Sequence, residues 1–95
     1  MIKVMVERRF RLGRVEDVAR LLAELSRNER QQSGYISSET LWSVNDPSLW
    51  LDISTWTYSD QWKKWEVAPE HKEIQSEIEN LLIASEKVSI FNIVR

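Results

Sequence analysis

The chain contains no cysteine, and it has only two glycines and two prolines in 95 residues. The missing thiols exclude disulfides and thiolate metal sites, and they are typical of a protein in a reducing cytoplasm. The scarcity of glycine and proline predicts long elements and few turns. No apolar run approaches the roughly 18 residues of a membrane span, and the opening segment MIKVMVERRF is too charged for a signal peptide. We therefore expect a cytoplasmic protein with no membrane partner.

An excess of charge of one sign is also missing. Thirteen basic and fifteen acidic residues give a net charge of −2, and the two signs are mixed along the chain. Without a basic patch, nucleic acid is not an expected partner. The carboxylates lack the histidine and cysteine companions of a transition-metal site, so no metal is expected. A chain of this length forms one domain, which we place at residues 1–95.

The apolar residues that are present recur in two patterns. Alternation predicts strands, and recurrence at helical spacing predicts helices. These patterns give strands at 2–12, 35–44, 49–58 and 87–94, and helices at 13–32, at 60–67 and from 69 onward. The resulting β-α-β-β-α-β order is the split βαβ arrangement. It predicts an α+β fold in which a four-stranded antiparallel sheet carries helices on one face.

Two of the predicted strands have more large apolar residues than one covered face requires. The last strand is apolar on both sides, and the third carries Trp50, Trp56 and Tyr58 on the face assigned away from the helices. Helices on one face should leave a polar second face, and an exposed apolar face usually marks an interface. We therefore expect a homodimer in which two sheets meet face to face.

Small hydroxyl side chains gather on the face assigned to the helices. If the four-residue turn at 45–48 pairs Val44 with Leu49, the cluster on this face is Ser38, Thr40, Thr55 and Thr57. Packed cores rarely group such residues, whereas a ligand cleft needs a few of them in an apolar lining. Arg8 is the one polar residue on the apolar face of the first strand. It is therefore expected to point into the same space, or else to pair with a carboxylate.

Tryptophan is concentrated in STWTYSDQWKKWEVAPEH, residues 54–71, and the only histidine, His71, ends that segment. Trp62 and Trp65 lie on neighbouring rows of the short helix, so one or both are expected over the mouth of the cleft. Trp56 is assigned to the dimer. A structural interpretation competes with this one, because tryptophans at helical spacing usually belong to the core and a lone histidine is usually packed.

The order and spacing of SGYIS, ISTWTYSDQWKKW, PEH and SIFNIV resemble the antibiotic biosynthesis monooxygenase family, over essentially the whole chain. The resemblance implies a ferredoxin-like fold that pairs into a dimeric α+β barrel. It also implies cofactor-free oxidation of a phenol or quinol by O2. Trp65 matches the family's cleft tryptophan, and His71 matches a histidine early in the next helix.

The chain departs from parts of the family pattern. A related branch binds and degrades haem, but its iron-ligating histidine position reads Gln75 here and its first-strand asparagine reads Arg8. Haem degradation is therefore discounted, and no cofactor is expected. The asparagine that cofactor-free members use near the short helix has no match in DQWKKW.

Cofactor-free oxygenation of a small aromatic substrate needs a base, a donor that stabilises the anion, and a water-poor pocket. His71 is the candidate base, Arg8 the candidate anion stabiliser and Trp65 the candidate stacking surface. The candidate substrate-binding residues are Trp62, Ser38, Thr40, Thr55 and Tyr58. Two alternatives stay open: a non-catalytic dimer that binds a small ligand on the same scaffold, and a haem-binding protein with His71 as ligand.

Overall fold

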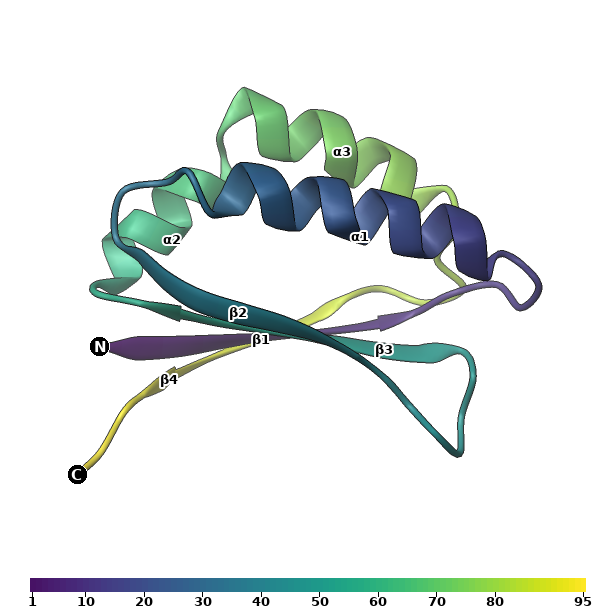
Figure 1. The fold of residues 1–95 in the computed structure, drawn as a ribbon, viewed down its shortest axis with the longest axis horizontal. Helices are drawn as coiled ribbons and strands as arrows, with labels where there is room; N and C mark the ends of the chain where they lie inside the picture. Colours follow the sequence, from purple (N-terminus) through teal and green to yellow (C-terminus); the bar gives the residue numbers. More distant parts are fainter.

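The computed structural model describes residues 1–95 as one sheet covered by helices on one face (Figure 1). Along the chain the elements are β1 (Ile2–Arg9), α1 (Val15–Glu29), β2 (Tyr35–Trp42), β3 (Leu49–Trp56), α2 (Ser59–Glu66), α3 (Pro69–Glu79) and β4 (Lys87–Asn92). None of the helices combines the length and the apolar character needed to cross a membrane.

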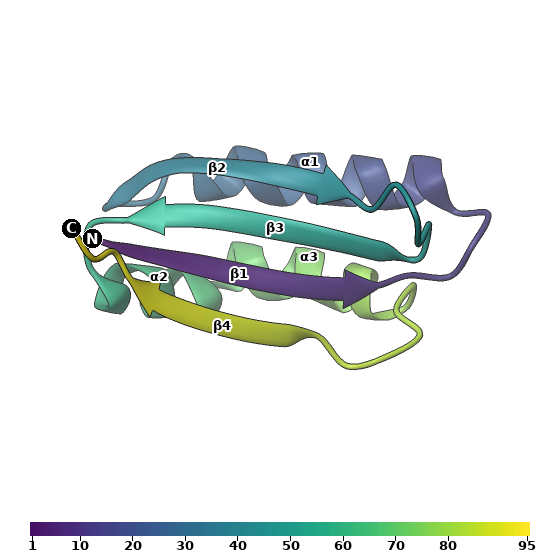
Figure 2. The ribbon, with the colours of Figure 1, turned by 90° about the horizontal axis from the view of Figure 1, so that it is seen from below.

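The four strands lie in the order β2-β3-β1-β4, and every neighbouring pair is antiparallel (Figure 2). This order, with α1 and α3 on one face, confirms the expected ferredoxin-like α+β fold. The second helical region is divided into α2 and α3. The division falls before Pro69, which has no N–H to donate and takes the first position of α3.

The core lies between the helices and the sheet. Four leucine and valine side chains of α1 and two isoleucines of α3 pack against residues of β1 and β3. Trp56 is completely buried in this layer, and its indole nitrogen donates to Ser54 Oγ at 3.0 Å. Trp62 and Trp65 of α2 belong to the same buried cluster. The structural interpretation is thus confirmed for Trp62 and Trp65, whereas the assignment of Trp56 to the dimer is wrong.

The predicted register of the β2–β3 hairpin is wrong by one residue. Trp42 pairs with Trp50, and Ser38 pairs with Ser54. The reason is the turn: Ser43 N donates to Leu49 O at 3.0 Å, so the connection is one residue longer than assumed. Asp46 organises that loop by accepting hydrogen bonds from the backbone and the hydroxyl of Ser48.

The one-residue difference exchanges the two faces of β3. Its four alternate residues Trp50, Asp52, Ser54 and Trp56 turn toward the helices, as Arg8 does on the neighbouring strand. Thr55 turns to the open face. Trp50 and Trp56 therefore form no part of the uncovered surface, contrary to expectation.

The open face of the sheet is nevertheless partly apolar. The register gives it Met5, Leu41, Leu49, Leu51, Ile53 and Phe91, with Lys3, Glu7 and Glu39 among them. Leu41 is 43% exposed and Phe91 is 51% exposed. No helix lies over this face (Figure 1). The expectation of an uncovered apolar surface holds, but smaller side chains than tryptophan supply it.

Candidate active site

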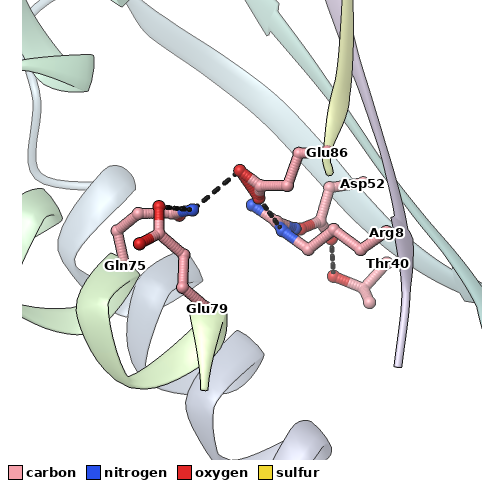
Figure 3. A network of polar contacts seen from close by, with 6 residues as sticks. All are labelled: Arg8, Thr40, Asp52, Gln75, Glu79 and Glu86. Atoms are coloured by element: carbon pink, nitrogen blue, oxygen red, sulfur yellow. Dashed lines mark hydrogen bonds and ion pairs between the residues drawn. The ribbon is translucent and has the colours of Figure 1, made fainter. Parts of the chain in front are cut away.

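Arg8 is the buried centre of a polar network between the sheet and α3 (Figure 3). Its side chain is only 4% exposed. Its Nη1 donates to Asp52 of β3, and its Nε donates to Oε2 of Glu86 at 2.6 Å. A buried guanidinium is tolerated when carboxylates neutralise it. The pairing interpretation of Arg8 is thus confirmed.

The network continues at both ends. Thr40 Oγ1 of β2 donates to Asp52 Oδ1 at 2.6 Å, and Gln75 Nε2 of α3 donates to Glu86 Oε1 at 2.7 Å. We call these five residues, Thr40, Asp52, Arg8, Glu86 and Gln75, the Arg8 network. It joins three strands, α3 and the segment before β4 (Figure 3). Because two carboxylates already surround Arg8, an anionic ligand would have to displace one of them.

His71 lies beside this network. It occupies the first turn of α3 because Pro69 starts that helix. The imidazole packs edge-on against Trp65, with ring centroids 5.0 Å apart and planes at 87°. Its Nδ1 is buried and has no hydrogen-bond partner. Burial lowers the pKa of His71 below 6.5 and the Arg8 charge lowers it further, while Glu86 opposes the shift. The imidazole is therefore neutral at neutral pH and keeps one acceptor nitrogen.

Glu29, the last residue of α1, lies near the Trp65 indole as well. Burial raises the pKa of Glu29 from 4.5 to about 7, and the negative charge of Asp52 contributes. The nearby Trp65 indole, the charge of Arg8 and the nearby Ser38 hydroxyl partly offset that rise in pKa. None of the five ion pairs in the chain includes Glu29.

The space under α1 is small. A cavity of about 20 Å³ lies between α1 and the sheet, and its polar lining is Ser26, Glu29, Ser38, Thr40, Asp52 and Ser54. That volume suits a single water molecule. A larger groove of about 460 Å³ lies at the end of α1 and along α2, lined by Gln32, Ser33, Gln61, Lys64, Trp65 and Ala68. Its size is in the range of small-molecule sites. Trp65 lines this groove and also contacts His71.

The sequence-predicted site residues divide into two groups. Arg8, Thr40 and Ser38 lie on the helix-facing side of the sheet, and Trp65 and His71 lie above them. The Ser38 hydroxyl lies 2.7 Å from the Tyr35 hydroxyl. Trp62 is buried in the core.

Two predicted residues lie elsewhere. Thr55 is on the open face, where its Oγ1 accepts from Lys3 Nζ at 3.2 Å. Tyr58 is 67% exposed before α2. The register error explains the misplacement of Thr55.

Three site residues were missed by the sequence reasoning. Asp52 was assigned to the wrong face by the register error, and Glu86 precedes a strand with no pattern to mark it. Glu29 did carry a signal. It is four residues after Leu25 and seven after Leu22, so it shares the buried face of α1.

Known proteins support this description of the fold. The antibiotic biosynthesis monooxygenase family model matches residues 1–77. A crystal structure of an antibiotic biosynthesis monooxygenase superposes with a TM-score of 0.91 at 17% identity, covering 100% of both chains. Rv0793 from Mycobacterium tuberculosis superposes with a TM-score of 0.88 at 13% identity, and the match covers 99% of this chain and 95% of Rv0793. SnoaB, a cofactor-independent oxygenase from Streptomyces nogalater, superposes with a TM-score of 0.85 at 15% identity. The match covers 99% of this chain and 94% of SnoaB.

No curated protein sequence matches the chain. The structural likenesses are at low identity and establish the fold, whereas the sequence match covers most of the chain. On that match, the chain belongs to the antibiotic biosynthesis monooxygenase family.

Proposed function

We propose that the chain is a cofactor-independent monooxygenase that oxidises an aromatic phenol or quinol with O2. Membership of the family supports this, as does the similar fold of SnoaB, described as a cofactor-independent oxygenase. The observation that carries the proposal is the unpartnered Nδ1 of His71, buried beside Trp65. A neutral imidazole next to an aromatic surface supplies the base and the stacking partner that this chemistry needs.

The proposed reaction can be written for an anthrone, a phenol tautomer with a CH2 group. His71 takes a proton from the CH2, and the carbanion passes its electron pair to O2, with formation of a C–O bond. The second C–H bond and the O–O bond then break. One oxygen atom becomes the ketone, and the other leaves as water with both hydrogens. The substrate itself supplies the electrons, so no further reductant is consumed.

The substrate is proposed to bind in the groove against Trp65. The cavity under α1 has room for about one water, whereas the groove has a volume of about 460 Å³. Contact between substrate and His71 therefore requires the Trp65 ring to turn. Ser38 and Thr40 would then lie at the inner end of the site. Arg8 would act through its positive charge on His71, because its own donors are engaged by Asp52 and Glu86.

A homodimer formed through the open face of the sheet belongs to the same proposal. Leu41 and Phe91 are exposed on that face among other apolar residues. Two copies that pair there would bury these side chains and leave both grooves accessible. Sedimentation of the purified protein tests this part, and a lone folded protomer at micromolar concentration would contradict it.

Oxygen uptake with an anthrone or a hydroquinone tests the activity. Trp65→Phe and His71→Gln should lose uptake while their sedimentation stays that of the parent. Lys72→Ala, an exposed position next to His71, is the matched control. Tight binding of a phenol with no turnover by the parent protein would instead favour a ligand-binding role.

A further inference from the structure

Three carboxyl groups lie between the helices and the sheet, and they differ in their partners. Asp52 and Glu86 both pair with Arg8. Glu29 has no cation, and it lines the water-sized cavity together with Ser38, Thr40 and Asp52. An unpaired carboxylate in a half-buried position beside another carboxylate is costly, so this environment favours the protonated form of the group.

Glu29 and His71 approach the same side chain from different helices. His71 of α3 packs edge-on against the Trp65 ring, with the ring centroids 5.0 Å apart, and Glu29 at the end of α1 lies near enough to the Trp65 indole for that group to lower the Glu29 pKa. A substrate that takes the place of the Trp65 ring would therefore meet a carboxyl on one helix and an imidazole on the other.

We infer that Glu29 is the proton donor of the site and works as the acid partner of His71. This role rests on the proposed function. After His71 has taken the first proton and O2 has bonded to carbon, the Glu29 proton passes to the terminal peroxide oxygen. The Glu29 carboxylate then accepts the second C–H proton as the carbonyl forms and the O–O bond breaks. The departing hydroxide takes the proton held by His71, which releases water and restores both residues.

The protonation states of the two residues suit Glu29 as the proton donor and His71 as the proton acceptor. Because burial raises the pKa of Glu29 to about 7 and lowers the pKa of His71, a large fraction of the Glu29 carboxyls holds a proton at neutral pH while His71 is mainly neutral. Asp52 and Arg8 are the charged groups that act on Glu29, and Arg8 and Glu86 are those that act on His71. Asp52 and Arg8 belong to the sheet, which lies beneath both helices.

The test compares Glu29→Gln with Glu77→Gln, an exposed change on α3, in the full chain. The first readout is the carboxyl ¹³C titration of Glu29, with a midpoint expected near pH 7. The second is O2 uptake with an anthrone between pH 5 and 9. Glu29→Gln should lower kcat about 100-fold with little change in KM, and it should remove the fall in parent activity above pH 7. Glu77→Gln should change neither.

The possible failures can be told apart. Uptake in Glu29→Gln equal to that of the parent would overturn the role of Glu29 and leave the proposed function standing. A titration midpoint in the ordinary carboxyl range would also overturn the role. No uptake by the parent protein would overturn the proposed function and the role together. Circular dichroism checks that both variants are folded.

Discussion

The Trp65 and His71 rings meet edge to face, 5.0 Å apart, at the junction of α2 and α3. His71 is half-buried beside this contact, and its Nδ1 is buried without a partner. The chemistry of the proposed site and part of the pH dependence of its stability both follow from that placement.

His71 should make the fold less stable in acid. Its pKa is lowered below 6.5 on folding, so the unfolded chain binds a proton more readily than the native one. Its contribution to stability is present above pH 6.5 and is lost as the pH falls through the native pKa. Urea unfolding of the parent and His71→Gln at pH 7 and pH 5 measures this. The parent should lose more stability than the variant, and equal losses would argue against a buried imidazole.

Glu29 should have the opposite pH dependence. Its pKa rises from 4.5 to about 7 on folding, so its contribution is favourable below pH 4.5 and is lost as the pH rises through 7. Glu29→Gln should therefore raise the free energy of unfolding at pH 8 by about 1–3 kcal/mol, with little effect at pH 4.5. Chemical denaturation at the two pH values checks it. Destabilisation at pH 8 would mean that the carboxylate is favourably paired.

Arg8 should be one of the most sensitive positions in the fold. Arg8→Met leaves Asp52 and Glu86 as half-buried carboxylates with no cation. This change should lower the free energy of unfolding by about 3–5 kcal/mol. Arg9→Met is the matched control one residue along β1, because Arg9 pairs with Asp46 in solvent and should cost under about 1 kcal/mol. Urea unfolding compares the two variants. Similar costs for both would mean that the Arg8 network adds little.

A side chain at Gly34 should destabilise the fold. Its φ is +89°, and a Cβ there would overlap the side-chain amide of Gln61. That amide accepts a hydrogen bond from Tyr58 N at 3.0 Å at the start of α2. Gly34→Ala should lower the free energy of unfolding by about 2 kcal/mol. The causes are backbone strain at alanine and displacement of the Gln61 side chain that caps α2.

Gly13 provides the control for that change. Its φ of +79° is similarly strained for alanine, but no atom lies within 4 Å of the added Cβ. Gly13→Ala should lower the free energy of unfolding by only about 1 kcal/mol, because it adds backbone strain at positive φ and no side-chain clash. Thermal unfolding of both variants decides the matter, and a larger loss at Gly13 would be inconsistent with the packing at Gly34.

The fold was predictable because the apolar periodicity of a short chain with few turn residues leaves little choice of order. The assignment of β3 side chains to the two faces of the sheet was not predictable. It depended on the length of one turn, and the Asp46 loop extends the connection by a residue. Since side chains in a strand alternate, that residue moved Trp50, Asp52 and Trp56 to the helix side.

The site was predictable only in part. Arg8 stood out as a lone charge on an apolar face, and His71 as the only imidazole. The carboxylates that hold Arg8 come from β3 and from the segment before β4, far apart in sequence, and no local pattern links them. Glu29 was detectable from its helical spacing, but its high pKa arises from tertiary packing against the sheet and Trp65.

The most direct test of the account is the oxygen balance of the metal-free protein with an anthrone. The parent should consume one molecule of O2 for each ketone formed, and His71→Gln should be slower by about 100-fold although it is equally folded. Equal rates in parent and variant, or no consumption above the protein-free rate, would contradict it.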